Sequence, residues 1–230
     1  MLRMPRLTVR QALQIITLLA FVFTGIPGAV YSTPSALKTI SIAEARVLPL
    51  GTVVTIDGSV TVPSGAFSSS TFDQGFAIQD NTGGIYVSTS DNLGFAPRQK
   101  VRVTGTLADT VQPGLLVLVN VTEVKAHGSG MKVPPLAVST GDVGEATEGT
   151  IVRITGTITQ PIVNDLPFGF IIVVNDGSGE VNSFVCASTG IDVSGLSIGQ
   201  TIEVTGFSGQ FADHFEVDPR TQSDIRIVTN

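Results

Sequence analysis

An internal repeat constrains the fold of this chain more than any other sequence feature. The segment 51–63 (GTVVTIDGSVTVP) aligns with 149–161 (GTIVRITGTITQP), and seven of the thirteen positions are identical. Two later pairs of segments, 75–80 with 169–174 and 100–105 with 201–206, follow in the same order. A unit that is repeated in this way predicts a repeated fold, so we expect two similar domains of about 95 residues each.

The alternation of apolar and polar residues predicts five short strands in each copy. In the first copy the predicted strands cover residues 52–62, 76–80, 85–88, 100–107 and 115–124. In the second copy they cover 150–160, 168–175, 180–187 and 200–207, with a last strand near 214–227. Ser41 and Glu44 match a capping box, which predicts a short helical turn before the first strand.

The first strand of each copy is long, and Gly58 lies in its middle, where glycine usually marks a bulge or a sharp bend. Five strands with a long bent first strand are what a small closed barrel requires, because one strand must pair at both ends. The predicted fold class is therefore all-β, with two consecutive five-stranded barrels. The predicted domains span 37–127 and 135–230, and residues 128–134 form a polar linker that follows His127.

The pattern GTVVTIDGSV, GFAIQDNTGGIYV and RQKVRVTGTL in the first copy resembles the OB-fold modules of secreted bacterial proteins, which often stand beside extracellular nuclease domains. It is also similar in outline to small periplasmic bacterial OB-fold proteins. The resemblance covers residues 40–125 well and 137–228 more loosely. It implies two OB-fold barrels and a ligand of the oligonucleotide or oligosaccharide class, and it implies no catalytic site.

The first 32 residues have the parts of a cleaved secretory signal peptide. Arg3, Arg6 and Arg10 precede an apolar run at 12–23, and small residues follow it. An uncleaved membrane anchor is the alternative, although the apolar run is short for a span of about 20 residues. The sequence thus predicts a secreted, periplasmic or cell-envelope protein, with no stable membrane insertion after cleavage.

Removal of these three arginines lowers the formal net charge from −6 to −9. An acidic protein repels phosphate backbones as a whole, so nucleic-acid binding would have to depend on a local basic patch. The second copy is the more acidic one, with 3 basic and 12 acidic residues over 133–230. We therefore expect the first copy to carry any site for a polyanion, and the second to serve as a spacer or a protein-facing module.

Residues that carry catalysis or bind metals are scarce, and no standard catalytic or nucleotide-binding motif is present. His127 is expected to be a solvated linker residue, and His214 a residue of a surface strand. Cys186 is expected to be a buried small apolar residue. The segment 175–180 (NDGSGE) is expected to be a turn between strands, with a weak calcium site as the alternative. The sequence predicts no enzyme activity, no cofactor and no structural metal.

One basic patch stands out in the first copy. Arg98, Lys100 and Arg102 occur at i, i+2 and i+4, so a strand would place all three on one side. The aromatic ring of Tyr86 is predicted to be external and close to them. Three cations and one ring are enough to hold single-stranded nucleic acid, because charges attract phosphates and the ring stacks on a base. An ordinary solvated strand face is the alternative interpretation.

Gln79 and Thr55 complete the predicted ligand-binding set, because both lie on polar faces of neighbouring strands. The second copy has Thr201 and Glu203 where the first has Lys100 and Arg102. The leading hypothesis is an exported, non-enzymatic protein that holds an oligonucleotide or an oligosaccharide on its first barrel. The rival hypothesis is a structural or protein-interaction module of the cell envelope, whose partner would be an envelope or secreted protein.

Overall fold

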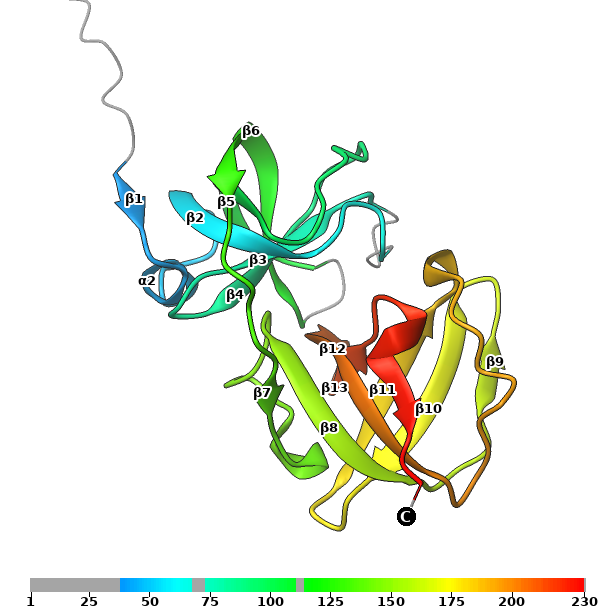
Figure 1. The fold of residues 1–230 in the computed structure, drawn as a ribbon. Helices are drawn as coiled ribbons and strands as arrows, with labels where there is room; N and C mark the ends of the chain where they lie inside the picture. Colours follow the sequence, from blue (N-terminus) through cyan, green and yellow to red (C-terminus); the bar gives the residue numbers. More distant parts are fainter. Residues whose placement is uncertain (1–37, 68–72, 111–113, 230) are drawn as a thin grey trace, which may run out of the picture. The chain divides into compact units, whose positions relative to one another are not determined.

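The structure is a computed structural model that describes residues 38–67, 73–110 and 114–229. The predicted signal peptide, residues 1–32, lies outside the described residues. Residues Leu37–Asn230 form one compact unit, which contains two β-barrels (Figure 1). Within the described residues, no helix has the length and apolar character needed to span a bilayer.

The first barrel has five strands that close on themselves. They are β2 (Val53–Val62), β3 (Phe76–Gln79), β4 (Gly84–Val87), β5 (Gln99–Asp109) and β6 (Leu116–Ser129). Their order is β2-β3-β4-β6-β5, and β5 also pairs with β2, which closes the barrel. Strands β4 and β6 are parallel, and the other neighbours are antiparallel. Counted along the chain, this is the 1-2-3-5-4-1 order of the OB-fold.

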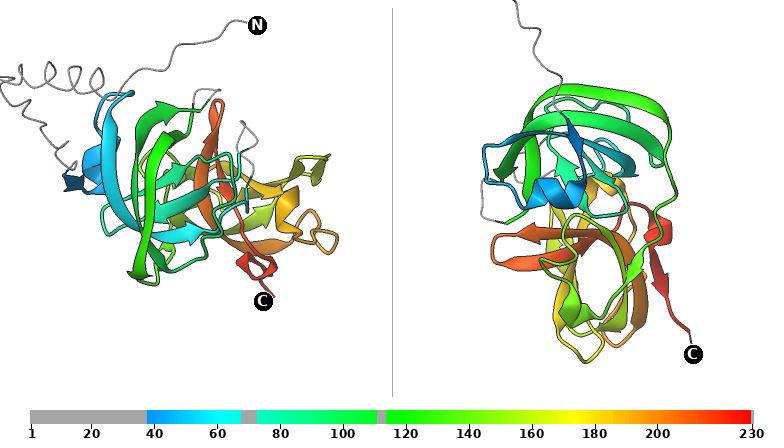
Figure 2. Two further views of the ribbon diagram at one scale, coloured as in Figure 1. Left: turned by 90° about the horizontal axis from the view of Figure 1, so that it is seen from above. Right: turned by 90° about the vertical axis from the view of Figure 1, so that its left-hand side faces the viewer.

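The second barrel repeats this order. Its strands are β8 (Ile151–Ile158), β10 (Gly169–Asn175), β11 (Glu180–Cys186), β12 (Thr201–Phe211) and β13 (His214–Asp218). Strand β12 pairs with both β13 and β8, so this barrel also closes. Figure 2 shows the curvature of both sheets from two further sides. The prediction of an all-β chain with two consecutive five-stranded barrels is confirmed.

Short elements extend both sheets. Strand β1 (Thr39–Ile40) pairs with β2, and helix α2 (Ile42–Arg46) follows it. The predicted capping box is present, because the Ser41 hydroxyl accepts from the Glu44 N–H while the Glu44 carboxylate accepts from the Ser41 N–H. In the second barrel, β7 (Leu136–Ala137), β9 (Val163–Asp165) and β14 (Ile225–Ile227) pair with β8, β10 and β12.

Gly58 and its counterpart Gly156 let the first strand of each barrel lie close to the second. A Cβ atom on Gly58 would be 2.9 Å from Cβ of Ile78, and one on Gly156 would be 2.8 Å from the carbonyl carbon of Asn175. Both distances are too short for real carbon atoms, so any side chain would push the two strands apart. The irregularity expected at Gly58 occurs further along, between Val60 and Val62.

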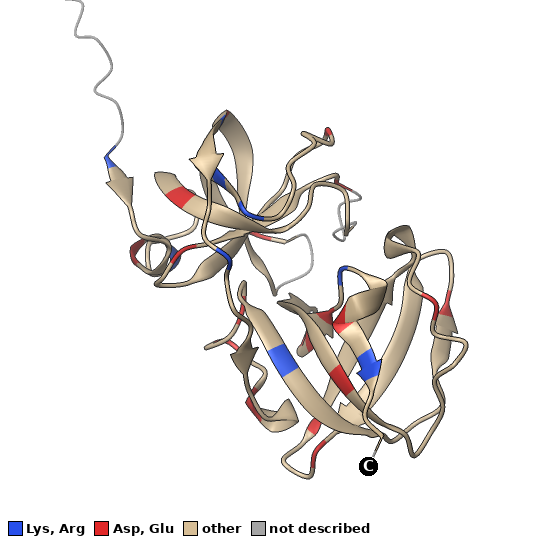
Figure 3. Ribbon diagram, in the orientation of Figure 1, with Lys and Arg blue, Asp and Glu red and all other residues tan. Residues whose placement is uncertain are grey.

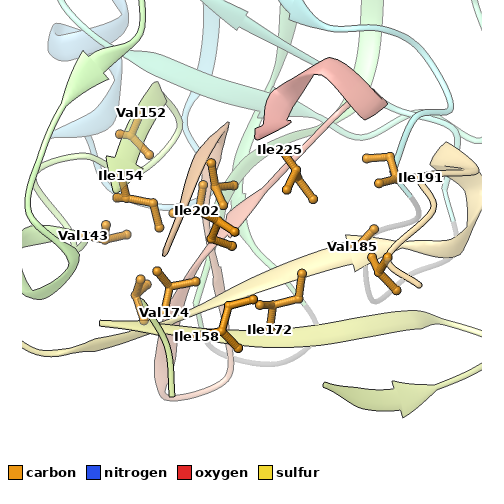
Figure 4. Close-up of a cluster of buried hydrophobic side chains, with 14 residues drawn as sticks. Val143, Val152, Ile154, Ile158, Ile172, Val174, Val185, Ile191, Ile202 and Ile225 are labelled. Atoms are coloured by element: carbon orange, nitrogen blue, oxygen red, sulfur yellow. The ribbon is translucent and has the colours of Figure 1, made fainter. Parts of the chain in front are cut away.

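Each barrel has its own apolar core, and a third apolar cluster is shared. The second core consists of Val and Ile side chains from all five strands and the adjoining loops (Figure 4). The shared cluster, called here the interbarrel cluster, consists of Val62, Phe67, Ala77, Tyr86, Leu115 and Val117 of the first barrel with Ile151, Cys186 and Phe207 of the second. Burial of this apolar area stabilises the pairing of the barrels.

Two further contacts join the barrels. Backbone atoms of Gly84 and Gly149 pack so closely that a Cβ atom on Gly84 would lie 1.9 Å from the Gly149 carbonyl oxygen. Nη2 of Arg46 lies 2.8 Å from Oε1 of Glu148, whose side chain is only 1% exposed. Burial raises the pKa of Glu148, and the Arg46 guanidinium opposes that rise.

One predicted strand boundary needs correction. Strand β6 continues to Ser129, so His127 lies in a strand and not in a solvated linker. The length of β6 was underestimated because its outer half alternates polar residues with small or exposed ones, which gives a weak apolar signal.

We expect Gly84→Ala to destabilise the protein by about 1–3 kcal/mol, since the added methyl group must displace the backbone of the second barrel. Thermal unfolding followed by circular dichroism measures the effect. Gly195→Ala is the matched control, because no atom lies within 4 Å of the position that its Cβ would take. An unchanged melting temperature for Gly84→Ala would show that the two glycines are not in contact.

Candidate functional site

Two neighbouring strands of the first barrel, β5 and β6, carry three cations, and the acidic residue Asp57 lies beside them on β2. In register, Arg102 on β5 lies opposite Asp57 on β2 and opposite Lys125 on β6. Lys100 lies opposite Ser59. The residues that alternate with Lys100 and Arg102 on β5, Val101 and Val103, are fully buried in the core. We call Arg98, Lys100, Arg102 and Lys125 the cationic face.

Arg102 forms a bidentate ion pair with Asp57. Its Nε and Nη2 atoms lie 2.8 Å from Oδ1 and 2.8 Å from Oδ2 of Asp57. The guanidinium of Arg102 lowers the pKa of Asp57, and Asp57 raises the pKa of Arg102. Nε2 of His127 lies 3.4 Å from Oδ1 of the same carboxylate. Asp57 therefore fixes the direction of Arg102 and cancels part of its charge.

Arg98 is exposed but does not belong to β5. It lies in the turn before that strand with a φ of 71°, and its N–H donates to the Val60 carbonyl at 2.9 Å. The predicted i, i+2, i+4 spacing therefore holds on the strand only for Lys100 and Arg102. Lys125, which is exposed, was missed because the fifth strand was predicted to end at Val124.

Tyr86 is not available to a ligand in solution, contrary to the prediction that its ring is external. The side chain does point away from the core of the first barrel, which Ile85 and Val87 fill. However, Tyr86 is only 2% exposed, because the interbarrel cluster covers it and the Phe207 ring lies 6.2 Å away. Its hydroxyl donates to Oδ1 of Asp73 at 2.8 Å, and burial followed by the Asp73 charge raises its pKa.

Gln79 and Thr55 are also engaged within the protein. Oε1 of Gln79 accepts a hydrogen bond from the Ile151 N–H at 3.1 Å, which is a contact to the second barrel. Thr55 is buried, and its hydroxyl lies 2.8 Å from the hydroxyl of Thr104. Of the six predicted residues, Arg98 and Lys100 are exposed, Arg102 and Gln79 are partly exposed, and Tyr86 and Thr55 are buried.

The second barrel has no corresponding cationic face. Glu203 on β12 lies within 3.9 Å of both Arg153 and Arg226, so its charge is balanced locally. Figure 3 shows acidic residues spread over the strands and loops of this barrel. The predicted difference in charge between the two copies is visible in the structure.

A polar groove of about 560 Å³ lies beside the cationic face. It is lined by residues 88–91, Leu93, Phe95 and residues 120–124. Asn120 has a φ of 47°, in the left-handed region, where the pairing of β5 with β6 loses its regular register between Thr104 and Thr106. Such backbone strain is common next to binding sites. The groove contains hydroxyl, amide and carboxylate groups around four apolar side chains, Leu93, Phe95, Val121 and Val124.

The remaining candidate residues do not assemble a reactive centre within the described ranges. No three His, Cys, Asp or Glu side chains in those ranges are placed to hold a metal ion. Cys186 is buried as predicted, with its sulfur 3.0 Å from the Ser188 hydroxyl. Residues 175–180 form the predicted turn, in which Asp176 accepts hydrogen bonds from Thr140 and Ser178.

No protein-family model matches this sequence, and a comparison with curated proteins finds no match. Among solved structures, a murine DNA-binding protein bound to double-stranded DNA is 12% identical with a TM-score of 0.42, over 76% of this chain and 96% of that one. Fission yeast Pot1 with single-stranded DNA is 12% identical with a TM-score of 0.36, over 83% and 88%.

The hypothetical protein ygiW from E. coli is 16% identical with a TM-score of 0.30, over 40% of this chain and 91% of that one. All three TM-scores lie below 0.5, so these similarities do not indicate a ligand for this chain.

We expect Tyr86→Ala to destabilise the protein by about 3–5 kcal/mol, because it removes a large buried ring from the interbarrel cluster. Tyr86→Phe keeps the ring and removes one donor to the Asp73 carboxylate, so it should cost about 1–3 kcal/mol. Urea unfolding measures both. A Tyr86→Ala variant that is as stable as the parent would instead support the predicted external ring.

Proposed function

We propose that the chain is an exported, non-enzymatic binding protein that holds a segment of single-stranded nucleic acid on the cationic face. The main support for this proposal is that Lys100, Arg102 and Lys125 lie side by side on β5 and β6, with Arg98 in the turn just before β5. Strand spacing separates successive cations by about 5–7 Å, which suits successive phosphates of an extended strand.

The electrostatics of the whole chain limit this binding to the first barrel. Lys and Arg are concentrated there, while the second barrel carries most of the acidic residues. Phosphates should be attracted to the cationic face and repelled by the second barrel, so a bound strand should follow β5 and β6 only. The ring of Tyr86 is buried, so base stacking contributes nothing there and the affinity should depend strongly on salt.

The double variant Lys100→Glu/Lys125→Glu should weaken the binding of a 12-nucleotide single strand at least tenfold. It should also reduce the slope of log Kd against log salt concentration by about 1.4, since each phosphate contact to a single strand contributes about 0.7. Fluorescence anisotropy at several salt concentrations measures both quantities.

Arg226→Glu is the control for that experiment, because it makes the same kind of charge reversal on an exposed side chain of the second barrel. It should change the affinity less than threefold. If both variants bind as the parent does, or if the parent does not bind, the cationic face is not a nucleic-acid site.

Asp57→Asn should have the opposite effect and tighten oligonucleotide binding about threefold to tenfold. The substitution removes the carboxylate that neutralises Arg102 and restrains it on the face. The same anisotropy titration measures the change. A weaker affinity would show that Asp57 positions Arg102 for binding and does not compete with the ligand.

An oligosaccharide is the second candidate ligand, and the polar groove favours it. Asp91 and Glu123 line the groove and would repel phosphates, whereas carboxylates, hydroxyls and the Asn120 amide suit sugar hydroxyls. Titration with neutral oligosaccharides distinguishes the two candidates. Binding that is insensitive to salt and is lost in Glu123→Gln would favour the sugar.

A further inference from the structure

A second cavity, of about 720 Å³, lies beside the interbarrel cluster and away from the cationic face. This volume is in the range of sites for small organic ligands. Residues of both barrels line it, and six of them are aromatic. The aromatic residues are Phe67 and Tyr86 of the first barrel, with Phe168, Phe184, Phe207 and Phe211 of the second.

Two carboxyl groups interrupt this apolar wall. Glu216 and Asp218 alternate on β13, so both point to the same side of the strand, and both line the cavity. Gly209 lies opposite Glu216 in register, and a Cβ atom there would be 3.1 Å from Oδ2 of Asp218. The missing side chain at Gly209 leaves room beside the acid pair.

The acid pair has no complementary partner within the described residues. Asp218 is 9% exposed, and its Oδ1 atom accepts no hydrogen bond there. No Lys or Arg is among the described residues that line the cavity, whose other titratable groups are Tyr86, Asp165, Cys186 and His214. A buried carboxyl without a partner is costly, so an unfilled acceptor that faces a cavity indicates where a donor from a ligand belongs.

The charge state of the pair indicates what kind of donor fits. Burial raises the pKa of Glu216 to about 7. Burial, followed by the charge of Glu216, raises the pKa of Asp218 well above its usual range. Near neutral pH the pair therefore holds at least one proton and carries at most one negative charge. A single cationic group with several N–H donors would neutralise that charge and occupy the free acceptor.

We propose that this cavity binds a small organic ammonium compound, with its aryl or alkyl body against the aromatic wall and its ammonium group on Glu216 and Asp218. The aromatic rings favour such a ligand for two reasons, because they bury its apolar body and attract its cationic group to their faces. Neither the oligonucleotide nor the oligosaccharide of the proposed function has this combination, so the inference stands independently of it.

Isothermal titration calorimetry with 2-phenylethylammonium chloride on the purified chain tests the proposal. We expect measurable binding at pH 7, with 2-phenylethanol at least tenfold weaker and 3-phenylpropanoate showing no binding. Asp218→Asn and Glu216→Gln should each weaken ammonium binding at least tenfold. Asp213→Asn, on a fully exposed side chain of the same hairpin, is the control and should bind as the parent does.

Two further measurements keep the outcome clear. Phe211→Ala removes an exposed part of the aromatic wall, so it should weaken the binding of the ammonium compound and of the alcohol by the same factor. This measurement tests the cavity even if Asp218→Asn fails to fold. Oligonucleotide affinity should not change in any of these variants. Absence of ammonium binding at millimolar concentration, equal affinity for the alcohol, or full affinity in Glu216→Gln would each overturn the proposal.

Discussion

The apolar contact between the two barrels determines which surfaces of the protein can act. Ala77 and Tyr86 lie on the outer side of β3 and β4, the second and third strands of the first barrel. In an OB-fold that side, with the loops next to it, commonly binds the ligand. Here Ile151, Cys186 and Phe207 of the second barrel cover it. The repeat thus joins two barrels by using a surface that a single barrel would offer to a ligand.

Outside this contact the structure offers two surfaces of different chemistry, an exposed cationic face and an aromatic cavity with an acid pair. On β5 and the later part of β6, the first barrel keeps exposed cations, with Arg102 already paired to Asp57. Beside the contact, aromatic side chains line a cavity with two carboxyls, the half-buried Glu216 and the buried Asp218. An exposed cationic strand attracts polyanions over a distance, whereas an apolar cavity selects a small ligand by shape and by one charge. The two surfaces therefore call for different probes.

The sequence was sufficient to predict each barrel, because the determinants of a barrel are local. Alternation located the strands, the aligned glycines at 58 and 156 lie where strands cross closely, and the repeat supplied an independent check on both. The Ser41–Glu44 cap was predicted for the same reason. The ends of strands were harder to predict, since the polar outer half of β6 has little apolar periodicity. Lys125 was therefore missed, and His127 was assigned to a linker.

The candidate site was predicted only in part, because its accessibility depends on how the barrels pack. Alternation indicated correctly that Tyr86 points away from its own core. No local pattern could show that Phe207, more than a hundred residues later, would pack on it. The acid pair was missed for a related reason, because Glu216 and Asp218 look like ordinary exposed strand residues until aromatic residues of both barrels pack around them.

Tyr86 is buried between the two barrels, and quenching of tyrosine fluorescence measures that burial in solution. The chain has no Trp and two Tyr, at positions 31 and 86, so a Tyr31→Phe variant emits from Tyr86 alone. In acrylamide titrations we predict that quenching of the folded variant is several times weaker than quenching of the same variant in 8 M urea. Equal quenching in the two states would mean that solvent reaches Tyr86 in the folded protein and that the second barrel does not cover it.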